Sequence, residues 1–109
     1  MKLSTGVNET AEPRTSRRLV YVDDEAAVVL VVKRLLERRG HKVTGYVSAE
    51  LALKAIEEDP SSFDILATDY NMPKISGLEL IKRVRALRSD ARMVLTSGVI
   101  TDELRAEAL

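Results

Sequence analysis

The sequence predicts an α/β fold of the doubly wound type, in which helices cover both faces of a parallel sheet. Segments with the pattern of a strand and segments with the pattern of a helix alternate four times along the chain, with short joints between them. The third predicted strand, FDILAT, is apolar almost throughout, as expected of a strand that is covered on both faces. At 109 residues the chain is long enough for one domain with a single core.

The domain is expected to span residues 18–109. Residues 1–17 are polar, contain Gly6 and Pro13 and show no apolar periodicity, so we interpret them as a flexible leader or linker. The first strand is predicted at 18–22, where the apolar run RLVYV is followed at once by two aspartates.

The segment after this strand has the spacing of a helix. Asp24 is suited to its start and Gly40 to its end. The β-branched residues at 28–32 are also compatible with a strand, but the apolar spacing continues through KRLLERRG, beyond the length of an ordinary strand. The predicted apolar stripe consists of Val28, Val31, Val32, Leu35 and Leu36.

A second strand is predicted at 41–47, where HKVTGYV is weakened by its glycine, and a third at 63–68. Between them, residues 48–59 form a predicted helix with Ser48 as its N-cap. The apolar side of that helix is expected to contain Leu51, Leu53, Ala55 and Ile56.

The last predicted elements are a helix, a strand and the beginning of another helix. Ser76 and Glu79 have the spacing of a capping box ahead of a helix at 77–87. The run RMVLT at 92–96 is the fourth predicted strand, and residues 101–109 begin a fourth helix.

Composition excludes several classes of function. Lysine plus arginine and aspartate plus glutamate both number 17, so the formal net charge is zero and direct nucleic-acid binding is not expected. The chain has no cysteine, which excludes disulfides and thiolate metal sites. Its longest aliphatic run is too short to span a membrane, and the N-terminus lacks the apolar core of a secretory signal. We therefore expect a soluble cytoplasmic domain.

Polar residues follow three of the predicted strands. Right-handed crossovers deliver the carboxyl ends of parallel strands to the same edge of the sheet, where ligands bind. Asp23 and Asp24 follow the first strand, Asp69 follows the third, and Thr96 and Ser97 follow the fourth. These residues are the candidates for a functional site.

The three aspartates are compatible with helix capping or with a metal site. A capping aspartate contributes roughly 1 kcal/mol and accounts for Asp24 alone. Two carboxylates about 4 Å apart repel each other by about 4 kcal/mol at an effective dielectric constant near 20, and capping does not offset this repulsion. A divalent cation does, and an oxygen-only donor set favours Mg²⁺ or Mn²⁺ over Zn²⁺.

The motifs VDDE at 22–25, TDYNMPKISG at 68–77 and VLTSG at 94–98 resemble those of the receiver domain of two-component response regulators. The resemblance covers residues 18–109. It implies a flavodoxin-like sheet with strand order 2-1-3-4-5, which places the first and third strands side by side.

The resemblance also implies roles for individual residues. Asp69 corresponds to the acceptor of a phosphoryl group from a sensor histidine kinase or phosphotransfer protein. Asp23, Asp24 and Asp69 would hold Mg²⁺, with the backbone carbonyl of Asn71 as a further ligand. A hydroxyl after the fourth strand would contact the phosphoryl group, and Ser97 is preferred over Thr96 because a small residue, glycine, follows it.

Part of the family pattern is missing from this sequence. Receivers continue through a fifth strand that ends in a phosphate-pairing lysine and through a fifth helix, but no lysine follows Lys82 and the sequence ends at Leu109. We therefore expect a fragment with strand order 2-1-3-4, for example of a hybrid histidine kinase. Its apolar edge at 92–96, together with Val29 and Leu30, predicts a marginal monomer or a dimer through strand four and the first helix.

Two alternative functions stay open. A pseudo-receiver, an interaction module without phosphorylation, is favoured by the missing lysine and disfavoured by the intact aspartates. A Mg²⁺-dependent aspartyl-phosphate phosphatase of the haloacid-dehalogenase type requires a D-x-D motif that VDDE does not supply.

Overall fold

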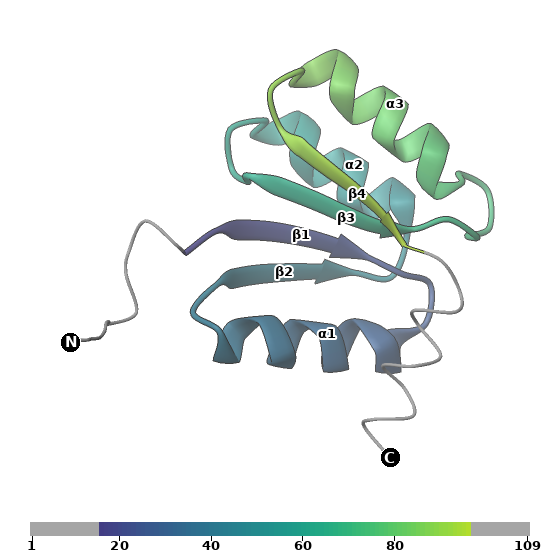
Figure 1. Ribbon diagram of the computed structural model, residues 1–109. Helices are drawn as coiled ribbons and strands as arrows, with labels where there is room; N and C mark the ends of the chain where they lie inside the picture. Colours follow the sequence, from purple (N-terminus) through teal and green to yellow (C-terminus); the bar gives the residue numbers. More distant parts are fainter. Residues whose placement is uncertain (1–15, 97–109) are drawn as a thin grey trace.

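The computed structural model describes residues 16–96, in which strands and helices alternate. The described strands form one parallel sheet in the order β2-β1-β3-β4, as the sequence predicts (Figure 1). The elements are β1 (Arg18–Val22), α1 (Ala26–Arg38), β2 (Lys42–Tyr46), α2 (Ala49–Glu58), β3 (Ile65–Asp69), α3 (Gly77–Leu87) and β4 (Arg92–Thr96).

Helices cover both faces of the sheet. In Figure 1, α1 lies below the sheet and α2 and α3 lie above it. Successive side chains of a strand point to opposite faces, so Val20 and Val22 of β1 pack with α2 and α3, whereas Tyr21 packs with α1. Each face has its own apolar cluster, which confirms the doubly wound arrangement.

The larger cluster lies between the sheet and the pair α2 and α3. Phe63, Leu66, Leu80 and Val84 are at most 1% exposed. Each such side chain contributes about 1.5–3 kcal/mol by its removal from water. This cluster fixes β3, and therefore the strand end at Asp69.

The start of α1 differs from the prediction. Its N-cap residue is Glu25, which makes no capping hydrogen bond through its side chain, and Asp24 is exposed one residue before it. The Asp23 carboxylate instead accepts a hydrogen bond from the Glu25 backbone N–H at 2.9 Å. The end of the helix agrees with the prediction, because Gly40 follows with a φ of 92°, a conformation that glycine adopts without strain.

The buried face of α1 is rotated relative to the predicted stripe. Val29, which the stripe leaves out, is 8% exposed, whereas Val31 and Leu35 are half-buried. The cause is Gly45 in β2, where a Cβ atom would overlap the Val29 Cγ1 atom. Because Gly45 has no side chain, Val29 packs directly against the backbone of β2.

The predicted caps of α2 and α3 are present. Ser48 Oγ accepts a hydrogen bond from the Leu51 N–H at 3.0 Å, and Ser76 Oγ accepts one from the Glu79 N–H at 3.2 Å. The capping box is half formed, because the Glu79 carboxylate pairs with Arg83 at 3.1 Å. Leu51 was predicted on the apolar side of α2 but is 53% exposed, and alanines of the same helix are buried instead.

Arg88 ties the end of α3 to the loop before β3. Its guanidinium donates hydrogen bonds to the carbonyls of Pro60 and Phe63 and lies 5.1 Å from the centroid of the Phe63 ring. It also pairs with Asp90 at 2.9 Å. The C-terminal end of α3 is therefore anchored near the start of β3, on the side of the sheet away from the carboxyl ends of the strands.

The apolar edge predicted for the fourth strand is also present. β4 is an edge strand of the described sheet, and its Val94 and Leu95 are 41% and 42% exposed. The dimer predicted through this strand and the first helix stays a prediction.

Gly77 brings the start of α3 against the backbone of β3. A Cβ atom on Gly77 would overlap the Asp69 carbonyl oxygen and lie 3.0 Å from Leu95 Cδ1. The Gly77 N–H also donates to the Tyr70 carbonyl at 3.0 Å. A glycine is therefore required here for close approach rather than for an unusual φ.

We expect Gly77→Ala to lower the free energy of unfolding by about 1–3 kcal/mol, because the added methyl group must displace backbone. Alanine is more favourable than glycine in a helix by about 1 kcal/mol. Helix propensity alone would therefore predict a more stable variant, so a loss of stability reports the backbone contact. Urea unfolding measures it, with Lys82→Ala on the exposed side of α3 as a control expected to stay within about 0.5 kcal/mol. Equal or greater stability of Gly77→Ala would contradict the contact.

Candidate metal and phosphoacceptor site

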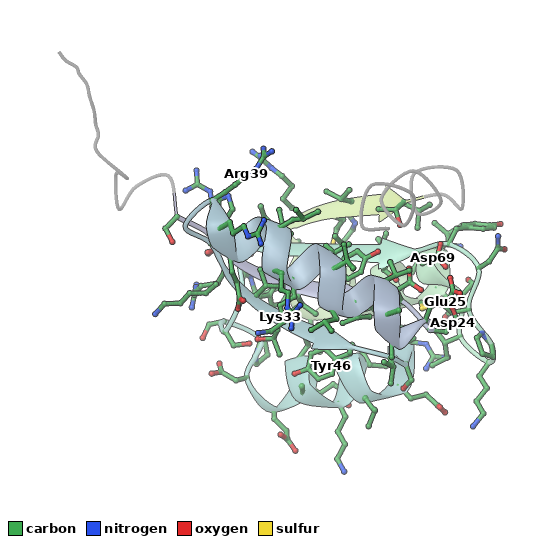
Figure 2. The ribbon with its side chains drawn as sticks, turned by 90° about the horizontal axis from the view of Figure 1, so that it is seen from below. Asp24, Glu25, Lys33, Arg39, Tyr46 and Asp69 are labelled. Carbon is green, nitrogen blue, oxygen red and sulfur yellow. The ribbon has the colours of Figure 1, made fainter. Side chains whose placement is uncertain are left out.

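Three carboxylates lie together at the carboxyl ends of β1 and β3. One oxygen from each of Asp23, Asp24 and Asp69 lies within 4.8 Å of the other two. Asp23 is 1% and Asp69 8% exposed, whereas Asp24 faces solvent. In Figure 2, Asp24 and Asp69 lie at the same end of the sheet, next to Glu25. The three aspartates predicted from the sequence are thus brought together.

Strand pairing causes this convergence. Val22 of β1 is in register with Thr68 of β3, so Asp23 and Asp69 leave neighbouring strands at the same level. The Asp23 N–H donates to the Tyr46 carbonyl at 3.1 Å, which ties the first loop to β2 as well. The positions of these two carboxylates therefore follow from the sheet itself.

The Asp23 carboxylate is held through both of its oxygens. Oδ1 accepts from the Glu25 N–H at 2.9 Å, and Oδ2 accepts from the Tyr21 hydroxyl at 3.2 Å. Sequence analysis missed Tyr21. The spacing in the sequence indicates this contact, because residues two apart in a strand share a face and Tyr21 is two residues before Asp23.

The Asp69 carboxylate is less completely bonded than that of Asp23. The backbone N–H groups of Tyr70 and Asn71 favour its charged form and so lower its pKa. Its Oδ1 atom is buried, and no donor of the described residues bonds to it. A buried polar atom without a partner is rare in a native fold and costs roughly 1–3 kcal/mol. Asp69 Oδ1 is thus the atom in the site with unused bonding capacity.

Burial and mutual repulsion raise the pKa values of two of the carboxyls. For Asp69, burial raises the pKa most, and the charge of Asp24 adds to it, against backbone hydrogen bonds that lower it. For Asp23, burial again raises the pKa most, followed among the raising effects by the charge of Asp69. The fold therefore concentrates negative charge where it is poorly solvated.

The site residues fit a hard divalent cation. Every available side-chain ligand is a carboxylate oxygen, the donor type that Mg²⁺ prefers. A cation would offset the raised pKa values and would give Asp69 Oδ1 the partner that the residues between 16 and 96 do not supply.

Thr96 lies beside Asp69 at the end of β4. The two residues are in register, the Tyr70 N–H donates to the Thr96 carbonyl at 3.1 Å, and Thr96 Oγ1 donates to the Thr68 carbonyl at 3.3 Å. Asn71 is exposed in the loop after β3. Ser97, the leader up to residue 15 and the helix predicted at 101–109 lie outside the described residues.

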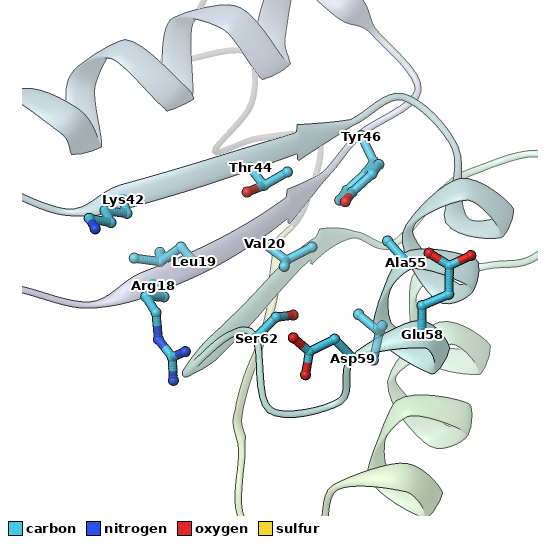
Figure 3. A pocket seen from close by; sticks show the side chains of 11 residues that line it. Arg18, Leu19, Val20, Lys42, Thr44, Tyr46, Ala55, Glu58, Asp59 and Ser62 are labelled. Atoms are coloured by element: carbon cyan, nitrogen blue, oxygen red, sulfur yellow. The ribbon is translucent and has the colours of Figure 1, made fainter.

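Two pockets of the described fold differ in their relation to this site. One of about 350 Å³ opens between α2 and strands β1 and β2, with Arg18, Lys42 and Tyr46 in its lining and none of the three aspartates (Figure 3). The other, of about 200 Å³, has Asp24 and Met72 in its wall. The second pocket borders the carboxylates, and the first is separate from them.

Comparison with known proteins identifies the family. Residues 19–109 match the model of the response regulator receiver domain. This chain belongs to that family. The receiver domain is a module of two-component signalling, and the match favours it over the phosphatase alternative.

Two curated relatives of this receiver domain are much longer proteins. It is 32% identical over 94 residues to the sensory/regulatory protein RpfC of Xanthomonas campestris, covering 86% of this chain and 13% of that protein. It is 38% identical over 76 residues to the virulence sensor protein BvgS of Bordetella pertussis, covering 70% of this chain and 6% of that protein. The chain thus spans a small part of the length of these relatives.

Solved structures agree with the fold. The response regulator TrrA of Thermotoga maritima, crystallised in complex with Mg(2+)-BeF, has a TM-score of 0.70 and 30% identity, covering 75% of this chain and 70% of its own. The receiver domain of the hybrid histidine kinase CckA has a TM-score of 0.67 and 27% identity, covering 84% and 99%. Between residues 16 and 96, no helix is long and apolar enough to cross a membrane.

We expect Asp69→Asn to raise the melting temperature at pH 7 in the presence of a chelator. A raised pKa in the folded state means that folding favours the protonated carboxyl, so stability falls as pH rises from the ordinary value near 3.8 through the raised one. Asparagine removes this penalty, and the advantage should vanish below pH 3.8. Thermal unfolding across pH measures it.

Asp64→Asn provides the control of opposite sign. Its hydrogen bonds with Arg18 lower the pKa of the Asp64 carboxyl, so its stabilising effect is present above the ordinary pKa and is lost as pH falls. That variant should be slightly less stable at pH 7. An Asp69→Asn protein that melts at or below the wild-type temperature at pH 7 would contradict the electrostatic account.

Proposed function

We propose that this receiver domain accepts a phosphoryl group on Asp69 from a phosphohistidine of a sensor histidine kinase or phosphotransfer protein. The observation that carries the proposal is the buried Asp69 Oδ1 atom, which has no hydrogen-bond partner among the described residues and belongs to a three-carboxylate cluster. A carboxylate oxygen that accepts no hydrogen bond from the described residues keeps its lone pairs for a metal ion or an incoming phosphoryl group.

The reaction uses few groups. Asp69 Oδ1 attacks phosphorus, the bond from phosphorus to the donor imidazole nitrogen breaks, and the imidazole leaves with the bonding electron pair. Asp23 and Asp24, with Asp69 and the Asn71 backbone carbonyl, are the residues that would hold Mg²⁺. When bound, Mg²⁺ supplies charge neutralisation between the carboxylates and the phosphoryl oxygens.

The surroundings of Asp69 support this role. The Tyr70 N–H donates to the Thr96 carbonyl at 3.1 Å, and the Gly77 N–H donates to the Tyr70 carbonyl at 3.0 Å. Gly77 also fits against the Asp69 carbonyl and packs the following helix onto the same strand end. These contacts fix the strand end that carries the carboxylate before a donor arrives, and a positioned nucleophile reacts faster.

The relatives support a cellular setting. RpfC and BvgS are sensory proteins, and CckA is a hybrid histidine kinase. The proposal therefore places this domain in the cytoplasmic part of a phosphorelay, with a histidine-containing protein as its partner and without nucleic acid binding of its own.

Acetyl phosphate and Mg²⁺ are expected to add one phosphoryl group to the chain, and Asp69→Asn to prevent the addition. Intact-mass analysis measures it, and the product should be labile to hydroxylamine because it is an acyl phosphate. A chelator should also prevent the reaction.

Asp90→Asn is the matched control, because Asp90 is exposed and pairs with Arg88 away from the three aspartates. It should be modified like the wild type. Equal uptake of phosphate by wild type and Asp69→Asn would refute the assignment, and no uptake by the wild type would favour the pseudo-receiver alternative.

Thr96 and Ser97 are the two candidates for the hydroxyl that contacts the phosphoryl group. The sequence pattern favours Ser97, whereas the register of β3 with β4 places Thr96 beside Asp69. We expect Thr96→Ala to keep phosphorylation but lose the change in the β4 amide resonances that accompanies it, while Ser97→Ala keeps both. The reverse result in NMR spectra would assign the contact to Ser97.

A further inference from the structure

The Tyr21 hydroxyl is the side-chain donor that holds the Asp23 carboxylate. It donates to Asp23 Oδ2 at 3.2 Å, and the remaining oxygen of Asp23 accepts from the Glu25 backbone N–H at 2.9 Å. Asp23 is therefore fixed in rotation, in contrast to Asp69, whose Oδ1 has no partner among the described residues. The two buried carboxylates of the site therefore differ in how many of their oxygens accept hydrogen bonds from the described residues.

The tyrosine ring is itself fixed by packing. Tyr21 is 3% exposed, and Ala67 lies in register with it on β3, where a small side chain leaves room for the ring. The hydroxyl therefore has a set direction at the edge of an apolar cluster. The cluster around the ring consists of Val28, Val29, Val32, Val43 and Ala67, with Leu19 and Leu36 at its border.

The electrostatic surroundings of the phenol agree with this hydrogen bond. Burial raises the pKa of Tyr21 most strongly, and the charge of Asp23 raises it further. Asp69 also raises it, whereas the Thr96 hydroxyl acts in the opposite direction. The phenol is thus surrounded by the functional groups that end β1, β3 and β4.

We propose that Tyr21 is a positioning residue for the metal site, which orients the Asp23 carboxylate toward Asp24 and Asp69 and so sets the affinity for Mg²⁺. The proposal rests on the function proposed above, because it concerns the same three carboxylates. Groups that hydrogen-bond to metal ligands fix the ligand orientation, and their loss typically weakens metal binding by about 10–100-fold.

Tyr21→Phe tests the proposal, since it removes the hydroxyl and keeps the ring in its apolar cluster. We expect the Kd for Mg²⁺, measured by NMR titration of the whole chain, to rise about tenfold. Tyr46→Phe is the matched control, because Tyr46 packs with the cluster on the other face of the sheet. It should bind Mg²⁺ like the wild type.

A spectroscopic measurement on the wild-type side chain separates a positioning role of Tyr21 from a packing role, and it does not require Tyr21→Phe to fold. Mg²⁺ draws electron density from Asp23, so the hydrogen bond from Tyr21 weakens and the ¹³Cζ resonance of Tyr21 should move in the wild type while that of Tyr46 stays. Tyr46→Phe and Tyr70→Phe assign the resonances of the other two tyrosines of the chain, so the third resonance belongs to Tyr21. A Tyr21 resonance that ignores Mg²⁺ binding would overturn the proposal even if Tyr21→Phe folds poorly.

The outcomes distinguish this inference from the proposed function. If the wild type and Tyr21→Phe bind Mg²⁺ equally, or the variant binds more tightly, the positioning role is wrong and the metal site stands. If the wild type shows no Mg²⁺-dependent shifts at residues 23, 24 and 69–71, the metal site fails and the positioning role with it. Asp24→Ala, which is expected to abolish binding, confirms that the measured Kd belongs to this site.

Discussion

The parallel pairing of β1 with β3 is the constraint on which the site depends. It delivers Asp23 and Asp69 to one edge of the sheet, where both are largely removed from water. Removing two like charges from water together is unfavourable, and the raised pKa values of these carboxyls record that cost. Burial of the apolar clusters on both faces of the sheet supplies the free energy that holds the strands in this register.

The carboxylates of the site differ in their hydrogen bonds. Asp23 has donors on both oxygens, whereas Asp69 has one oxygen that no described residue satisfies. The unequal arrangement leaves one atom free for bond formation, which fits the phosphoacceptor role proposed for this receiver domain.

Periodicity and turn signals predicted the elements and the three aspartates at the strand ends, because these depend on patterns that are local in sequence, whereas the strand order was implied by the resemblance to receiver domains. Some departures depend on contacts between distant segments, and others on hydrogen bonds between near neighbours that periodicity does not show. Val29 is buried because Gly45 lies opposite it, and Asp24 is free of capping because the Asp23 carboxylate bonds to the backbone at the start of α1. The Tyr21 contact was missed because an aromatic residue in a strand is usually assigned to the core, which is also where this one lies.

The two ends of α3 are held in different ways, one by a side chain and the other by direct backbone contact. Arg88 fixes one end to the loop before β3 and to the Phe63 ring. At the other end, Gly77 leaves no side chain between the helix and the Asp69 carbonyl. Because the Asp69 carbonyl and the start of α3 are in direct contact, a displacement of the Asp69 backbone would have to move this end of the helix, while Arg88 holds the other end in place.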